Sequence, residues 1–259
     1  MKYGICNLSV VPGRAEASDK SEIVTQVLFG ELLKVYESKQ SWFRCKTVPD
    51  NYECYIDSKQ FDWIEEEEFH QLKKIQPALS ADLVQVSQRS SDDQIIPIVM
   101  GSNLYNYQDN KFINGNTEYN FEGNVYPLES KPSKSRLKEN AFMYLNAPYL
   151  WGGRSPFGID CSGFVQLVYK LNGVQLPRDA SEQAKIGQTL SFIEEAEEGD
   201  LAFFDNDEGN IIHVGLMLEN NRIIHASGKV RIDRIDHQGI YNVDTKRYSH
   251  RLRLIKSIV

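Results

Sequence analysis

The stretch G-I-D-C-S-G-F-V-Q-L-V-Y-K, residues 158–170, places a cysteine where a loop gives way to an apolar, helix-like run. A purely structural cysteine would be expected inside the apolar run, whereas Cys161 stands at its start. A helix start offers unpaired backbone N–H groups and the positive end of the helix dipole, and both favour a thiolate over a thiol. The position of Cys161 therefore indicates a reactive thiol, which needs a base from elsewhere in the chain.

Two of the five histidines repeat one pattern on successive strand-like segments. His213 lies in I-I-H-V-G-L-M-L, residues 211–218, and His225 lies in R-I-I-H-A, residues 222–226. A short turn makes two such strands antiparallel neighbours, so the two rings can lie close together on one face. We expect His213 to take the proton of Cys161 and His225 to orient the His213 ring, with backbone N–H groups stabilising the oxyanion.

A zinc site is the alternative use of one cysteine and two histidines, with Asp160 as a further ligand. Zinc would more naturally use a second cysteine, so we predict neither a metal nor a cofactor. The remaining histidines, His70, His237 and His250, lie in charged or polar stretches and are expected at the surface.

Composition and charge exclude several classes of partner. The chain has 259 residues, 41% of them hydrophobic, and a formal charge of −7, which argues against nucleic acid or an anionic membrane as the main partner. It has no run of about 18 apolar residues and no signal-peptide pattern at its start. We expect a cytoplasmic monomer, or a secreted or periplasmic protein if a leader precedes this sequence. Cys6, Cys45 and Cys54 are expected to be reduced and buried.

The pattern of strand-like runs, helix-like runs and turns along the sequence predicts four segments. Residues 1–62 contain short strand-like runs separated by turns, which indicates a small barrel. Residues 63–80 form an acidic, helix-prone connector, and residues 81–130 form a second β module with an Asn-Gly hairpin turn at 114–115. Residues 134–259 contain helices followed by strands, which indicates an α+β domain with an antiparallel sheet.

Six motifs of this last segment closely resemble the NlpC/P60 family of cysteine peptidases and follow the order of that family. They are P-Y-L-W-G-G, D-C-S-G-F-V, P-R-D-A-S-E-Q, G-D-L-A-F-F, H-V-G-L and I-H-A-S. The resemblance covers about residue 137 to the end of the chain. It implies a papain-like fold with Cys161 as the nucleophile, His213 as the base and His225 as the orienting residue. It also implies cleavage of cell-wall peptides next to a γ-linked D-glutamate.

The front of the chain resembles a bacterial SH3 module. The resemblance rests on S-E-I-V-T-Q-V-L-F-G-E, Trp42 and D-N-Y-E-C-Y-I, although Cys54 and Tyr55 stand where the pattern has Gly and Trp. The second β module matches this pattern weakly. It is expected to be SH3-like from its size and from its short strand-like runs. SH3-like modules before such a catalytic domain are similar to the γ-D-glutamyl-L-diamino acid endopeptidases, also called dipeptidyl-peptidase VI.

In that family the substrate is a freed murein peptide, L-Ala-γ-D-Glu-L-Lys or its diaminopimelate counterpart, with a free L-Ala amine. An ammonium group requires a nearby carboxylate, because its burial without one is costly. The resemblance implies that acidic and tyrosine groups bind this amine. The residues implied are Asp160, Ser162 and Tyr149 in the catalytic domain, with Glu31 and Tyr52 in the front module.

Structural roles compete with these assignments. Asp160 can also cap the helix, and Tyr149 can pack under Trp151. Arg178 and Asp179 can pair with each other, or Arg178 can bind the α-carboxylate of D-Glu. At the level of function, the alternatives are an extracellular endopeptidase acting on intact wall, a non-catalytic wall-peptide-binding protein, and an acyltransferase or amidase on the same fold.

Overall fold

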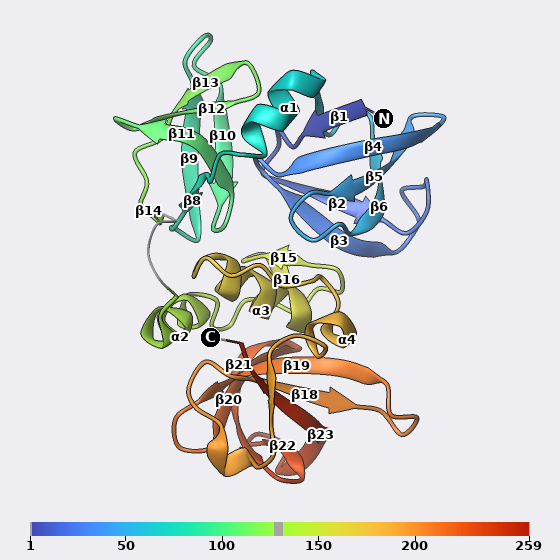
Figure 1. Cartoon of the computed structure of the whole chain (residues 1–259), viewed down its shortest axis with the longest axis vertical. Helices are drawn as coiled ribbons and strands as arrows, with labels where there is room; N and C mark the ends of the chain where they lie inside the picture. Colours follow the sequence, from blue (N-terminus) through green and yellow to red (C-terminus); the bar gives the residue numbers. More distant parts are fainter. Residues whose placement is uncertain (1, 127–131, 259) are drawn as a thin grey trace. The chain divides into compact units, whose positions relative to one another are not determined.

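The computed structural model describes residues 2–126 and 132–258, and the chain forms two compact units (Figure 1). The first unit contains Met1–Ser130 and Trp151–Pro156, and the second contains Lys131–Leu150 and Phe157–Val259. The predicted boundary after residue 130 lies outside the described residues.

Two antiparallel sheets of seven strands each build the first unit, and each forms an SH3-like module. The front sheet has the strand order β3-β2-β6-β5-β4-β1-β7, and the second has the order β10-β9-β13-β12-β11-β8-β14. The front strands are β1 (Lys2–Ile5), β2 (Val10–Arg14), β3 (Ile23–Leu28), β4 (Leu32–Lys39), β5 (Trp42–Thr47), β6 (Glu53–Asp57) and β7 (Asp62–Ile64). Helix α1 (Glu66–Leu72) follows them. The strands of the second sheet are β8 (Ala78–Ser80), β9 (Val84–Arg89), β10 (Ile95–Val99), β11 (Asn103–Gln108), β12 (Lys111–Asn114), β13 (Thr117–Asn120) and β14 (Val125–Tyr126). The short strand β15 (Arg154–Ser155) belongs to neither of these two sheets.

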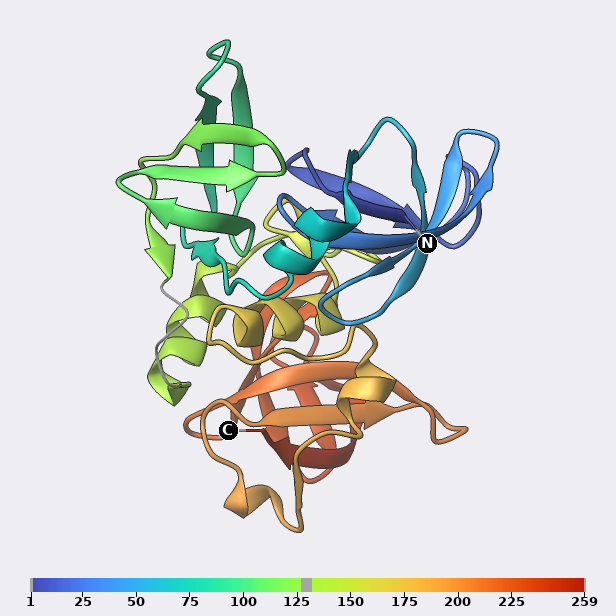
Figure 2. The same ribbon diagram turned by 45° about the horizontal axis from the view of Figure 1, so that its top comes forward.

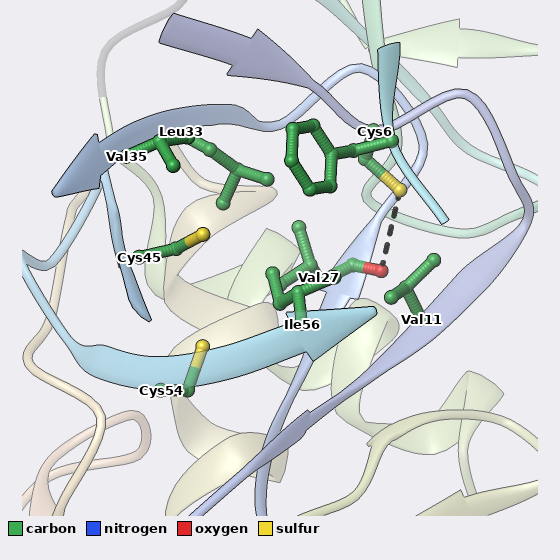
Figure 3. Close-up of a cluster of buried hydrophobic side chains, with 9 residues drawn as sticks. Cys6, Val11, Val27, Leu33, Val35, Cys45, Cys54 and Ile56 are labelled. Carbon is green, nitrogen blue, oxygen red and sulfur yellow. Dashed lines mark hydrogen bonds between the residues drawn. The ribbon is translucent and has the colours of Figure 1, made fainter. Parts of the chain in front are cut away.

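Three cysteines lie in the apolar core of the front module (Figure 3). Cys45 and Cys54 are directly opposite one another on β5 and β6, and the Sγ atom of Cys6 lies 3.7 Å from the carbonyl oxygen of Val27. All three thiols are free and buried. Burial raises the pKa of Cys6 and Cys45 to about 12 in each case, so these thiols are neutral core groups.

Aromatic side chains form the core of the second module. Phe112 stacks on Tyr119 with ring centroids 5.1 Å apart, and Phe29, which follows β3, meets both rings edge-on. A hairpin connects β12 and β13 as predicted, but its two turn residues are Gly115 and Asn116, one position later than the predicted Asn-Gly pair, because Asn114 pairs with Thr117 as the last residue of β12. Gly115 has a φ angle of +59°, a conformation in which glycine carries no steric cost.

Over residues 132–150 and 157–258, a closed antiparallel sheet and three helices build the second unit. The strand order is β17-β23-β18-β19-β20-β21-β22, and an additional pairing of β23 with β22 closes the sheet into a barrel. The helices are α2 (Lys134–Met143), α3 (Cys161–Lys170) and α4 (Ala180–Gln183), with a 3₁₀ turn η1 (Ile193–Glu195). The strands are β16 (Gly158–Ile159), β17 (Gln188–Leu190), β18 (Leu201–Asp205), β19 (Ile211–Leu218), β20 (Arg222–Ser227), β21 (Lys229–Asp236), β22 (Gly239–Asn242) and β23 (Arg247–Ser257).

Helix α3 packs against β19 and β20, and it lies alongside the barrel in both views (Figures 1 and 2). Every residue of α3 is buried, and β18, β19 and β20 are apolar over most of their length. These strands are covered on two faces, by α3 outside the barrel and by the barrel core inside, which explains their continuous apolar runs. The predicted α+β class is confirmed. Across residues 2–126 and 132–258, the helices are too short or too polar to cross a bilayer.

Candidate active site

The candidate nucleophile, Cys161, is the first residue of α3. The preceding residue, Asp160, has extended backbone angles, and its Oδ1 atom accepts a hydrogen bond from the N–H of Gly163 at 2.6 Å. This is an N-cap, so the helix begins at the cysteine because the aspartate before it satisfies an unpaired N–H. The structural role considered for Asp160 from the sequence is therefore present.

Burial dominates the protonation of the Cys161 thiol. It raises the pKa of Cys161 to about 12, and the neighbouring Asp160 carboxylate acts in the same direction. Hydrogen bonds from the backbone N–H groups of Val214 and Ser162 lower the pKa but do not outweigh burial. The helix start therefore holds a neutral thiol at rest, where the sequence predicted a thiolate. The bond from Val214 also places the sulfur beside the backbone of β19, at the residue that follows His213 in the sequence.

A buried ionic network holds Asp160 in place. The guanidinium of Arg178 donates to Oδ1 of Asp160 at 3.0 Å and to Oδ2 at 2.5 Å, and it also donates to the hydroxyl of Ser162 at 2.8 Å. Arg178 is 2% exposed and Asp160 is 6% exposed. The structure thus joins three of the predicted substrate-binding residues, Asp160, Ser162 and Arg178, in one network. Asp179 is exposed and occupies the N-cap position of α4.

The two predicted histidines meet through their ring nitrogens. Nε2 of His213 lies 2.9 Å from Nδ1 of His225, and both side chains are buried. Gly215 makes room for this contact, because a Cβ atom there would lie 2.9 Å from Cβ of His225 and 2.7 Å from Cδ1 of Ile223. The glycine of the H-V-G-L motif therefore has a steric role within β19, where its missing side chain leaves room for His225.

A carboxylate sets the tautomers of both rings. Oδ2 of Asp233, on β21, lies 3.1 Å from Nε2 of His225. Although burial opposes it, hydrogen bonds from His225 and Arg231 hold the pKa of Asp233 below its ordinary value, so the group is an ionised acceptor. Nε2 of His225 must then donate, its Nδ1 must accept, and Nε2 of His213 must donate. This leaves Nδ1 of His213 as a lone pair that can take a proton.

Burial also keeps the imidazoles neutral. It lowers the pKa of His213 well below the ordinary value, and the nearby rings of His225 and His250 add to this effect. Burial likewise lowers the pKa of His225, against the opposing influence of Asp233. The candidate site at rest therefore contains a neutral thiol and neutral imidazoles.

The structure corrects the prediction that His250 is a surface residue. Its ring is half-buried and stacks on the ring of His213, with centroids 4.1 Å apart and an interplanar angle of 20°. Its flanking residues, Ser249 and Arg251, are polar, and this polarity concealed an inward-facing position on β23.

Tyr149 is half-buried near the thiol. Burial raises the pKa of Tyr149 to about 12, and Cys161 and Asp160 act in the same direction, so the phenol is a neutral hydrogen-bond donor. In the second unit the structure therefore brings Tyr149, Asp160, Ser162 and Arg178 together around Cys161.

The two candidates from the front module have other surroundings. Glu31 is fully buried, and its carboxylate accepts hydrogen bonds from Arg154 at 2.8 and 3.0 Å. This ion pair gives Glu31 a structural role within the first unit, and its binding of the substrate amine stays a prediction. Tyr52 is half-buried directly before β6, and its N–H donates to the hydroxyl of Thr47.

The zinc alternative lacks support in the described part of the chain. Across residues 2–126 and 132–258, no group of three or more His, Cys, Asp and Glu side chains could hold a metal ion.

Known proteins match both parts of the chain. A model of the NlpC/P60 family matches residues 146–249, and a model of the bacterial dipeptidyl-peptidase SH3 domain matches residues 13–61. The chain is 40% identical over 107 residues to the probable endopeptidase NlpC of Escherichia coli K12, a match that covers 40% of this chain and 69% of that protein. The chain belongs to the NlpC/P60 family.

Two further relatives extend the NlpC/P60 match to the front of the chain. The chain is 29% identical over 222 residues to the γ-D-glutamyl-L-lysine dipeptidyl-peptidase of Bacillus subtilis, covering 79% of this chain and 72% of that protein. A crystal structure of an NlpC/P60 family protein from Bacillus cereus matches 99% of both chains with a TM-score of 0.82 at 19% identity, which shows a shared fold. The protein is a cysteine peptidase with a papain-like catalytic domain after two SH3-like modules.

Sequence reasoning missed three residues beside this NlpC/P60 site. His250 lay hidden among polar neighbours, but Asp233 and Arg231 did carry a signal. In V-R-I-D-R-I, residues 230–235, these two alternate on the face of Ile235, which faces the barrel core. A charged pair on a core-facing position needs partners, and this pattern pointed to a buried ionic network.

Proposed function

We propose that this protein is a γ-D-glutamyl-L-diamino acid endopeptidase acting on freed murein peptides that carry an unblocked N-terminal L-alanine. The observation that carries the proposal is the hydrogen-bonded series His213–His225–Asp233, together with a thiol at a helix start that bonds to the backbone of Val214, the residue after His213. The name of the Bacillus subtilis relative supports the γ-D-glutamyl-L-lysine bond as the point of cleavage.

The proposed reaction is acyl transfer through the sulfur. Nδ1 of His213 removes the proton of Cys161 as the sulfur attacks the γ-carbonyl of D-Glu, and His225 keeps the base oriented. The oxyanion accepts hydrogen bonds from the backbone N–H of Cys161 and from the hydroxyl of Tyr149. His213 then protonates the amine of the departing diamino acid, which leaves a thioester on the enzyme. Water, deprotonated by His213, hydrolyses this thioester and restores the thiol.

We propose that Asp160 binds the L-alanine ammonium, with Arg178 and Ser162 holding its carboxylate in position. A carboxylate has about four lone-pair sites, so an anchored group can accept a further donor. Roles for Glu31, Tyr52 and Asp179 in substrate binding stay predictions.

The test is hydrolysis of L-Ala-γ-D-Glu-L-Lys, followed by chromatography of the products. We expect L-Ala-D-Glu and free lysine, no turnover with Cys161→Ala, and loss of cleavage when the alanine is N-acetylated. Turnover by Cys161→Ala would refute the thiol mechanism. Equal rates on free and acetylated tripeptide would refute the binding of the amine.

Cytoplasmic recycling is the cellular form of this proposal. An enzyme of recycling should prefer the free tripeptide to intact wall and should appear in the cytoplasmic fraction of the cell. Efficient release of peptides from intact sacculi by the purified protein, together with its detection outside the cell, would instead favour a wall hydrolase.

A further inference from the structure

The half-buried ring of His250 has no part in the proposed reaction, yet it covers a face of the base. Its centroid lies 4.1 Å from that of His213, and the two rings are inclined by 20°. We propose that His250 is a positioning residue, whose ring fixes the plane of His213 so that Nε2 of His213 stays directed at Nδ1 of His225. This inference rests on the proposed function of His213 as the base.

The register of the barrel brings the two rings together. His213 on β19 is opposite Phe204 on β18, and His250 on β23 is opposite Ile240 on β22. Directly opposite side chains share a face of a sheet, and Phe204 and Ile240 belong to the same buried core cluster. Both histidines therefore project from the inner face of the barrel, although they are 37 residues apart in sequence.

The other aromatic neighbours do not cover the His213 ring in parallel. Phe204 lies 5.7 Å away at an angle of 46°, and His225 meets the ring nearly edge-on at 86°. Rotation about the Cβ–Cγ bond of histidine is soft, because the ring is joined by one broad torsion. A second ring stacked in parallel at van der Waals distance opposes that rotation, and the imidazole of His250 is such a ring.

The stacked ring of His250 is neutral, which is favourable beside a base that gains and loses a proton. Burial lowers the pKa of His250 to about 4, with His225 acting in the same direction and Asp233 opposing it. A neutral ring can stack on His213 before protonation, and its π face attracts the imidazolium afterwards. The hydroxyl of Ser249 lies 2.9 Å from Nδ1 of His250, and this hydrogen bond fixes the orientation of the His250 ring.

Three substitutions of His250 distinguish the effect of its flat ring from the effect of its nitrogen atoms. His250→Phe keeps a flat ring, whereas His250→Ala removes it and His250→Leu fills the space without a plane. We expect Ala and Leu to lower kcat by roughly 10- to 100-fold with little change in KM, because a misplaced catalytic group costs rate rather than binding. Phe should restore most of the rate. His237→Ala, an exposed histidine outside the cluster, is the matched control and should behave as wild type.

A second measurement does not depend on turnover. Proton NMR in water detects the hydrogen-bonded Nε2–H of His213 as a downfield resonance, which should persist in Phe and be lost or broadened in Leu. Wild-type kcat in Leu, or a Phe variant as impaired as Leu, would overturn the proposal for His250. Activity retained in His213→Ala, or a wild-type enzyme inactive on the tripeptide, would instead contradict the proposed function. In those cases the NMR comparison alone decides the role of His250.

Discussion

At Cys161 the helix start and burial act on the thiol in opposite directions, and burial has the larger effect. The thiol is neutral with a pKa of about 12, and the lowered pKa of His213 makes the proposed base neutral as well. A neutral pair exchanges its proton only when the developing charges are stabilised, and in the proposed reaction the substrate carbonyl and the oxyanion donors supply that stabilisation. Under this proposal, the reactivity of the cysteine depends on the tautomer and orientation of His213.

The tautomer argument predicts a large kinetic effect far from the sulfur. In Asp233→Asn the amide can donate as well as accept, so it no longer requires Nε2 of His225 to be the donor. We expect kcat to fall by at least about 100-fold with little change in KM, since a wrong tautomer disables the base in comparable triads. Steady-state kinetics on the tripeptide measures this. Asp236→Asn, on the same strand and bonded to Tyr248, is the control, and equal kinetics for both variants would contradict the argument.

At the scale of elements, the strands β19, β20 and β23 bring three imidazoles to the inner face of the barrel. A sheet places polar rings there only when its closure and register supply partners, here Asp233 for His225 and the rings for one another. All three have a pKa lowered by burial. The histidine cluster, His213, His225 and His250, therefore links the protonation of the site to the stability of the barrel.

This linkage predicts loss of stability in mild acid. Between about pH 6.5 and the lowered pKa of each ring, about 4 for His250, the unfolded chain binds protons that the folded barrel does not. The free energy of unfolding should therefore rise with pH through this window. On acidification from pH 7 to 4.5 it should fall by roughly a few kcal/mol. Urea unfolding followed by the NMR signals of barrel residues at several pH values measures it, because the three tryptophans all lie in the first unit. His250→Phe should flatten the dependence, and an unchanged slope would contradict the linkage.

At the scale of the whole molecule, the chain places six residues from just before the nucleophile into the first unit. Arg154 of this segment donates to Glu31 and to the carbonyl oxygen of Gln26, at 2.6 Å for the latter. Gly152 has a φ angle of +76°, and a Cβ atom there would lie 2.2 Å from the carbonyl oxygen of Ile23. The segment is thus built into the SH3-like unit by a buried ion pair and a close backbone approach.

The buried ion pair predicts a strong and asymmetric effect of substitution. Arg154→Ala leaves the buried Glu31 carboxylate without its guanidinium partner and should lower the free energy of unfolding by about 3–5 kcal/mol. The double substitution of Arg154 and Glu31 by methionine should cost much less, because no charge remains buried. Urea unfolding measures both. Glu22→Gln, at an exposed residue bonded to Trp151, is the control, and a loss of similar size there would contradict the argument.

Local patterns were enough to predict the α+β class, the helix that begins at Cys161 and the paired strands of His213 and His225. The physical reason is that helix caps, alternation and short turns act between residues close in sequence. Asp160 illustrates this, because its capping bond reaches only to Gly163.

Only the tertiary structure decided the protonation of the thiol, the inward position of His250 and the partner of Glu31. Burial depends on everything packed around a group, and the closure of β22 on β23 brings together rings from distant parts of the chain. Arg154 and Glu31 are 123 residues apart, and neither shows in its local sequence that it is buried. Contacts of this range follow from how the layers pack, which a local pattern does not encode.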